Sequence, residues 1–287
     1  MGSLRLTLIS FERMINTKLK EKLTTTDYIG AVDFGKTAKD YGRFRPSFPA
    51  RFYEKLSSYN IGVRGQKVLD IGCGTGAITR QISIQGCEVI GLDPAKRMVV
   101  EAKSMDPQIE PKVSYVVGRA ESICFLEEVF DVVTAGQCWH WFQHEYALKE
   151  VQRVLRPGGK LAIAHLDWLA IPGSVASVTE TLIHKHNQSW STKGTYGLYP
   201  RWLAQIREGG FVGIETFSFD IDFSFTHQQW IGRIRASAGV AASLSQDAIG
   251  RFCDDLSQLL KYEYPESVLL IPHRVWAVIS NKPTRER

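Results

Sequence analysis

The feature that most constrains this chain is a short apolar run ending in three closely spaced glycines. Val68–Ile71 is followed by Gly72, Gly74 and Gly76, and residues 77–86 then read as a helix. Glycine tolerates a positive φ and lets a ligand approach the bare backbone, while the start of a helix presents unpaired N–H groups. The pattern therefore predicts a strand, a ligand-binding turn and a helix, which is how a βαβ unit begins.

The same alternation of β-branched runs and amphipathic segments continues along the chain. Pro94 is expected at the first position of a helix, and Pro-Gly-Gly at 157–159 is expected to make a turn. Strands that alternate with helices form parallel sheets with right-handed crossovers. Strands are predicted at 67–71, 87–93, 112–118, 130–136, 160–166, 211–223 and 267–282.

The remaining segments give the domain organisation. Residues 1–27 are predicted to be an N-terminal extension, because their apolar run is too interrupted by charge for a secretory sequence. Residues 28–287 are predicted to be one domain. Segments near 167–199 and 226–265 do not continue the alternation of strands and helices, and we expect them to form a cap over the sheet.

The amino-acid composition limits the kinds of partner that this chain is expected to bind. The net charge of +5 is spread along the chain without a Lys/Arg-rich run, so no nucleic-acid partner is expected. No stretch approaches the roughly 18 apolar residues of a membrane span. Five cysteines without a CxxC pair indicate reduced thiols, a cytoplasmic location and no metal site. The oligomeric state stays open.

Two cofactor classes fit the glycine turn. Gly72, Gly74 and Ala77 match the GxGxxA pattern of dinucleotide sites, and Asp93, 21 positions beyond Gly72, suits a ribose hydroxyl pair in either class. Asp70 separates them, since a carboxylate two residues before the first glycine suits an ammonium group and would lie poorly beside a pyrophosphate.

Four motifs taken together resemble the class I S-adenosylmethionine-dependent methyltransferases. They are DIGCGTG at 70–76, Asp93, FDVVTAGQ at 130–137 and LRPGGKL at 155–161. The upstream FGKTAKDYGRFRPSFP at 34–49 and HWF at 140–142 resemble a narrower branch that includes the trans-aconitate methyltransferase-like proteins.

The resemblance implies a Rossmann-like α/β fold with helices on both faces of a seven-stranded, mostly parallel sheet. Its order would be 3-2-1-4-5-7-6, with the last strand antiparallel. It also implies S-adenosylmethionine as the cofactor. Arg119 stands where many relatives have Asp, which puts a side-chain contact to the adenine amine in doubt. The implied cofactor-binding residues are Tyr41, Arg45, Asp70, Gly72, Gly74, Gly76, Asp93, Pro94, Ala120, Glu121 and Gln137.

His140 is the candidate catalytic residue, as a base or an orienting group, because histidine titrates near neutrality. The alternative is that the HWF triplet only walls the pocket. An arginine guanidinium can bind a substrate carboxylate through two hydrogen bonds. Several basic residues are scattered along the chain, and we expect at most one of them to have this role. They are Arg201, Arg233, Arg235, His273 and Arg274.

The sequence therefore predicts a methyltransferase acting on a small molecule, with a carboxylate as the favoured acceptor. A methyltransferase acting on RNA or protein would need an open basic face. A non-catalytic cofactor-binding relative would allow a degraded glycine turn, whereas this one is intact.

Overall fold

The computed structural model describes residues 42–106, 113–190, 196–241 and 243–284, so the predicted N-terminal extension and Tyr41 lie outside the described residues. A seven-stranded sheet in the order β3-β2-β1-β4-β5-β7-β6 forms its centre, which confirms the predicted fold. The strands are β1 (Lys67–Ile71), β2 (Glu88–Asp93), β3 (Val113–Val117), β4 (Phe130–Gly136), β5 (Leu155–Trp168), β6 (Val212–Phe225) and β7 (Leu269–Asn281).

The first five strands in the chain run parallel to one another, and β7 lies antiparallel between β5 and β6. Strand β1 lies between β2 and β4, and its residues from Val68 to Ile71 are buried, three of them apolar. Continuous apolar strands are typical of parallel sheets covered on both faces. The helices are α4 (Ala50–Ser58), α5 (Ala77–Ile84), α6 (Lys96–Ser104), η3 (Trp139–Trp141), α7 (His144–Val154), α8 (Val175–His186), α9 (Pro200–Glu208), α10 (His227–Arg235) and α11 (Gln246–Glu263).

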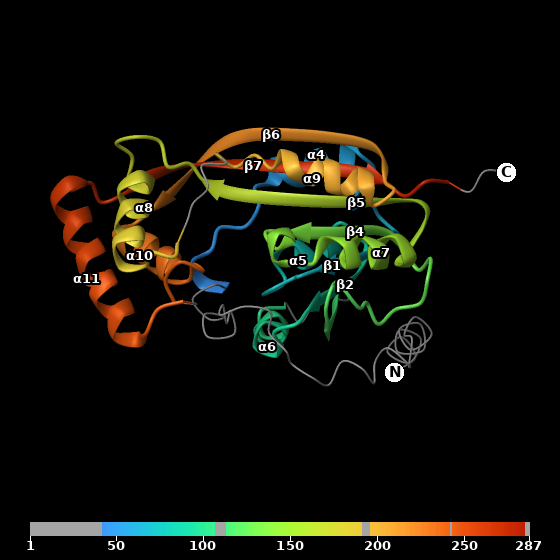
Figure 1. Cartoon of the computed structure of the whole chain (residues 1–287), viewed down its shortest axis with the longest axis horizontal. Helices are drawn as coiled ribbons and strands as arrows, with labels where there is room; N and C mark the ends of the chain where they lie inside the picture. The colour runs from blue at the N-terminus through green and yellow to red at the C-terminus, as the bar shows by residue number, and fades with distance from the viewer. Residues whose placement is uncertain (1–41, 107–112, 191–195, 242, 285–287) are drawn as a thin grey trace.

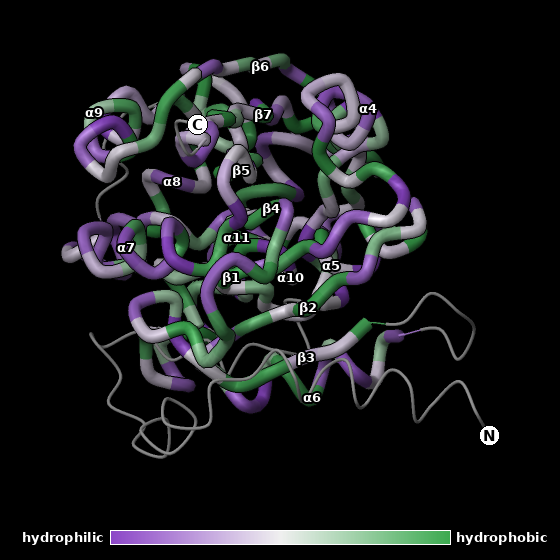
Figure 2. The backbone as a smooth tube through the Cα atoms, turned by 90° about the vertical axis from the view of Figure 1, so that its right-hand side faces the viewer, coloured by the Kyte–Doolittle hydropathy of each residue, from purple (hydrophilic) through white to green (hydrophobic). Residues whose placement is uncertain are grey.

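Helices cover both faces of this sheet. Figure 2 looks along the strands, with α7 and α9 on one side and α4 and α5 on the other. Successive residues of β1 serve the two cores: Leu69 packs with the α7 and α9 side, and Val68 packs with the α4 and α5 side. This alternation follows from the two-residue period of a strand.

The segments expected to form a cap contain α8, α10 and α11, which gather at the end of the sheet toward which β4 and β5 point (Figure 1). They share an apolar core of their own with the ends of β6 and β7. Trp230 of α10 lies at its centre, fully buried, and its Nε1 donates to Thr179 Oγ1 at 3.0 Å. The carboxyl ends of the parallel strands therefore face a helical layer.

Two local predictions are wrong. Helix α6 begins at Lys96, after Ala95 as its N-cap, because the Ala95 N–H is held by Asp93 Oδ1 at 2.8 Å and Pro94 stays outside the helix. Residues 157–159 do not form a separate turn. They lie within β5 as a bulge against β4, with Gly158 at a φ of 76°, because the pairing shifts between Phe130 and Val132.

The cap core supplies a stability prediction. Replacing Trp230 with Ala removes a fully buried indole and its hydrogen bond, which should lower the free energy of unfolding by about 3–5 kcal/mol. The matched control is Tyr262→Ala on α11, where the aromatic side chain is 89% exposed and the loss should stay within about 0.5 kcal/mol. Urea unfolding of both variants measures the difference, and equal losses would contradict the assigned core.

Candidate functional site

Five of the predicted residues line one hollow at the carboxyl edge of the sheet, which we call the loop hollow. Its wall is made by the glycine turn after β1, the end of β4, the start of α5 and the segment 42–48 that precedes α4. The predicted residues that line it are Arg45, Asp70, Gly72, Gly74 and Gln137. Ligands of open parallel sheets bind at this edge.

The glycine turn is held in a conformation that only glycine adopts easily. Gly72, Gly74 and Gly76 have φ angles of 65°, 55° and 79°. A side chain on Gly76 would strike Tyr115 Oη and lie 2.9 Å from Arg80 Nη1. The turn therefore requires glycine at this position, both for its φ angle and for the close packing beneath it.

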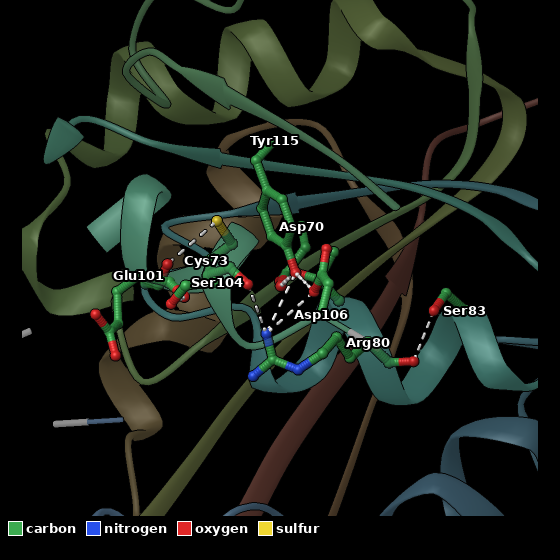
Figure 3. Close-up of polar contacts among 11 residues, drawn as sticks. Asp70, Cys73, Arg80, Ser83, Glu101, Ser104, Asp106 and Tyr115 are labelled. Atoms are coloured by element: carbon green, nitrogen blue, oxygen red, sulfur yellow. Dashed lines mark hydrogen bonds and ion pairs between the residues drawn. The ribbon is translucent and has the colours of Figure 1, made fainter. Parts of the chain in front are cut away.

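A polar cluster, drawn in Figure 3, packs against the turn at Gly76. Tyr115 Oη donates to Asp106 Oδ1 at 3.0 Å, and Arg80 Nη1 lies 3.4 Å from both groups. The cluster joins α5, β3 and the residues after α6. Sequence reasoning missed Arg80, although it also lines the loop hollow. Its position on the first turns of the helix after the glycines was the available signal.

Asp70 lies at the bottom of the loop hollow and is only 1% exposed. Its two carboxylate oxygens accept hydrogen bonds from Thr79 Oγ1 at 2.6 Å and Thr134 Oγ1 at 2.8 Å. Burial is the largest influence and raises the pKa of Asp70 to about 6. A cation in the hollow would stabilise the carboxylate, so this group suits an ammonium ligand.

Asp93 ends β2 and also holds the glycine turn. Its Oδ2 accepts from the Gly74 N–H and its Oδ1 from the Ala95 N–H, both at 2.8 Å. Burial raises the pKa of Asp93 to about 6. A carboxylate has about four lone-pair positions, so two hydroxyl groups could still be bound. The residue thus has a structural role that the sequence did not predict, beside the predicted one.

Gln137 is the first residue after β4, and its φ of 64° is one that non-glycine residues seldom adopt. Two hydrogen bonds to β5 hold it there: its N–H donates to Ala164 O at 2.8 Å and its Nε2 to Leu166 O at 2.6 Å. Backbone held in such a conformation is common at ligand sites.

Pro94, Ala120 and Glu121 are among the predicted residues that do not line the loop hollow. Pro94 is exposed and Ala120 is buried. Glu121 accepts from the Gln143 N–H at 3.0 Å and lies 3.5 Å from Arg119 Nε, so Arg119 takes part in an ion pair at the position where relatives have Asp. Their predicted cofactor contacts, and those of Asp93 and Gly76, stay predictions.

His140, in η3, belongs to a cluster that sequence reasoning did not find. Its Nδ1 lies 3.3 Å from His165 Nε2, and His165 Nδ1 lies 3.5 Å from Asp167 Oδ2. Desolvation and then the neighbouring His165 lower the pKa of His140, although part of the residue is exposed. His165 and Asp167 stand at the carboxyl end of β5, where polar residues in an apolar strand were the signal that could have found them.

The basic residues proposed for a carboxylate do not form one group. Arg274 pairs with Asp220 at 2.6 Å on an exposed part of β7, and Arg201 is exposed on α9. Arg233 and His273 are buried beneath the cap, where the Arg233 guanidinium lies 4.8 Å from the centre of a ring of Trp168. Arg45 alone among the predicted arginines lines the loop hollow.

The residues that the structure describes hold neither of two further kinds of site. No three His, Cys, Asp or Glu side chains there come together as metal ligands. No helix in that part of the chain has the length and hydropathy of a membrane span.

Residues 69–163 match the family model described as a methyltransferase domain. An uncharacterised methyltransferase of Mycobacterium tuberculosis is 34% identical over 133 residues, which are 46% of this chain and 51% of that protein. The chain spans about half the length of the curated relatives it matches.

Solved structures agree with the fold. A protein of Anaeromyxobacter dehalogenans described as a type II methyltransferase superposes with a TM-score of 0.62 at 20% identity, covering 84% of this chain and 100% of the other. Haemonchus contortus phosphoethanolamine N-methyltransferase 2, with S-adenosylhomocysteine bound, gives 0.54 at 20% identity, covering 89% and 61%. At these identities the likeness shows the fold alone. None of these descriptions names trans-aconitate, so the resemblance to the trans-aconitate branch stays a prediction.

The glycine turn supplies a second prediction. Gly76→Ala and Gly65→Ala both place a side chain at a positive φ, of 79° and 87°, but only at Gly76 would the new Cβ meet other atoms within 4 Å. We expect about 1–2 kcal/mol of strain for each, and roughly another 1 kcal/mol for Gly76→Ala because it displaces the Tyr115 hydroxyl. Urea unfolding measures both, and an equal loss would mean that the packing beneath Gly76 does not constrain the turn.

Proposed function

We propose that this chain transfers the methyl group of S-adenosylmethionine to a small-molecule acceptor. The observation that carries the proposal is the composition of the loop hollow, in which a buried carboxylate (Asp70) faces the same space as the glycine turn and Gln137. The methyltransferase-domain match over residues 69–163 supports the proposal independently.

The residues fit the charged end of this cofactor. Asp70 would bind the ammonium group of the methionine moiety, and the start of α5 would face its carboxylate, since Gly76 leaves the helix without a side-chain cap. A dinucleotide fits less well, because its pyrophosphate would lie beside the Asp70 carboxylate. Asp93, one strand further along the edge, would bind the ribose hydroxyls.

The sulfonium group supplies the reactive methyl when the cofactor is bound. The protein's part is then to align the acceptor and to exclude water. The helical layer of α8, α10 and α11 stands at the carboxyl end of the strands and favours an enclosed pocket for a small molecule. A macromolecular acceptor would call for an open, strongly basic face, and a net charge of +5 over 287 residues gives little support to one.

Two classes of acceptor place different demands on the site. A carboxylate, which the trans-aconitate resemblance favours, is ionised at neutral pH and needs no base. Arg45, at the wall of the loop hollow, would be the residue that binds it. A hydroxyl or ammonium acceptor must lose a proton, and the contact of His140 with His165 favours this second class.

The test of this proposal is cofactor affinity in an Asp93 variant. Asp93→Ala should weaken the binding of S-adenosylhomocysteine roughly tenfold or more, because two ribose hydroxyls lose a charged acceptor and Gly74 loses its anchor. Calorimetry on the purified chain gives the dissociation constant.

The matched control is Asp131→Ala. Asp131 is also a strand aspartate that accepts a backbone N–H, from Lys67 at 2.8 Å, but it lies at the opposite, amino-terminal edge of the sheet. Its replacement should leave cofactor affinity within about twofold while lowering stability. Equal affinities in wild type and Asp93→Ala would refute the role of Asp93.

A further inference from the structure

Four polar side chains form a continuous chain beside the loop hollow. From His140 in η3 it runs to His165 (Nδ1 to Nε2, 3.3 Å), then to Asp167 (Nδ1 to Oδ2, 3.5 Å), both on β5. Tyr199 Oη, just before α9, donates to the same Asp167 oxygen at 2.7 Å. The chain therefore links a partly exposed imidazole to a half-buried carboxylate.

The middle of the chain is rigidly held. His165 is 2% exposed, and its ring centre lies 4.5 Å from that of Tyr199 and 5.0 Å from that of Trp202. The Tyr199 and Trp202 rings are themselves stacked at 4.0 Å. Rotation of the His165 ring would require these aromatic groups to move. His165 Nε2 therefore stays next to His140, and His165 Nδ1 stays next to Asp167.

Asp167 sets the tautomer of His165 through its charge, because the 3.5 Å between Asp167 Oδ2 and His165 Nδ1 is an ion-pair distance and not a hydrogen bond. Burial opposes its charge, but His165, the Tyr199 hydroxyl and Arg45 together lower the pKa of Asp167 to about 2. An ionised carboxylate only accepts hydrogen bonds. The nitrogen facing it, His165 Nδ1, must carry a hydrogen, because a bare lone pair there would be repelled.

The tautomer of His140 follows from that of His165. In a neutral imidazole one nitrogen carries hydrogen and the other does not. With hydrogen on Nδ1, His165 Nε2 has a lone pair and can only accept from His140 Nδ1–H. His140 is left with a bare Nε2 on a partly exposed ring.

The segment that carries His140 adjoins the loop hollow. His140 is three residues beyond Gln137, which lines the loop hollow. Arg45 also lines the hollow, and its charge lowers the pKa of both His140 and Asp167. Cys138 and Phe142, which precede and follow His140, border Gly72 of the hollow, since a Cβ on Gly72 would lie 2.7 Å from Cys138 Cβ and 3.1 Å from Phe142 Cζ.

We propose that His140 Nε2 accepts the proton of a hydroxyl or amine acceptor, and that His165 and Asp167 are positioning residues that fix this tautomer. The inference rests on the proposed function and deepens it by naming the acceptor class. A carboxylate is disfavoured at this nitrogen, because two hydrogen-bond acceptors would face each other.

The proton balance of the step uses the whole chain. The acceptor oxygen or nitrogen forms a bond to the methyl carbon as the cofactor's sulfur–carbon bond breaks, and the sulfur keeps that electron pair. The acceptor proton passes to His140 Nε2, and the Nδ1 proton of His140 passes to His165 Nε2. The positive charge then rests on His165, beside the Asp167 carboxylate, and not on His140, whose own pKa is lowered.

Several charged groups face His140 from different elements. His165 on β5, Arg45 from the N-terminal segment and His144 on α7 lower its pKa, whereas Asp167 raises it. Tyr199 acts through its hydrogen bond to Asp167. Among these, Asp167 is the group whose replacement should release the tautomer of His165 and, through it, that of His140.

Nitrogen NMR of the imidazole rings tests the inference directly and needs no acceptor. Long-range ¹H–¹⁵N spectra of the full ¹⁵N-labelled chain near pH 7.5 distinguish a bare nitrogen from one that carries hydrogen. His140→Gln identifies the His140 signals among the seven histidines by their disappearance. We expect hydrogen on Nδ1 and a bare Nε2 in wild-type His140, and hydrogen on Nε2 would overturn the inference.

Asp167→Asn tests the positioning role. The asparagine amide can donate or accept, so both tautomers of His140 should become populated. His144→Gln is the control, because His144 lies near His140 but outside the chain, bonded to Trp139 O at 3.0 Å. An unchanged His140 tautomer in Asp167→Asn would remove Asp167 from the mechanism.

These outcomes are separable from the proposed function. If the chain binds S-adenosylhomocysteine but carries hydrogen on His140 Nε2, the cofactor assignment stands. The acceptor is then assigned to the carboxylate class. A chain with the expected tautomer that does not bind S-adenosylhomocysteine would refute the proposed function itself.

Discussion

The site depends first on the hydrogen bond from the Gly74 N–H to the Asp93 carboxylate, 2.8 Å long. It joins the turn after β1 to the end of β2, so that two neighbouring strands end in one rigid surface. Asp70 does the same on the other side, because its carboxylate ties β1 to α5 through Thr79 and to β4 through Thr134. Three strands and one helix are thereby fixed around the loop hollow.

This arrangement has an energetic cost that bears on ligand binding. Burial raises the pKa of Asp70 and Asp93 to about 6, above the values near 4 of an unfolded chain. A group of this kind stabilises the fold below about pH 4, and that contribution is lost as the pH rises through 6. At neutral pH both carboxylates are therefore ionised at the expense of stability. A bound ammonium would relieve the cost at Asp70, which couples cofactor binding to proton release.

The sequence predicted much of the fold because local and tertiary preferences agree: the apolar run 68–71, the glycine turn and the helix behind it all follow one pattern. It also predicted that Asp70, Gln137 and Arg45 would share a site. The contacts between individual side chains could not be predicted from the sequence. The contact of His140 with His165 joins the end of β4 to the end of β5, and no spacing along the chain reports the orientation of two rings across a sheet. The long β5, with its bulge at Gly158, likewise reflects pairing with β4 and β7 and not local turn preference.

The measurement that tests the account most directly is a calorimetric titration of the whole chain with S-adenosylmethionine and, separately, with NAD. The account predicts binding of S-adenosylmethionine at about pH 7.5, weaker binding near pH 5 where Asp70 must first lose its proton, and no binding of NAD. Tight binding of NAD with no binding of S-adenosylmethionine would contradict the assignment of the glycine turn, of Asp70 and of the chemistry built on them.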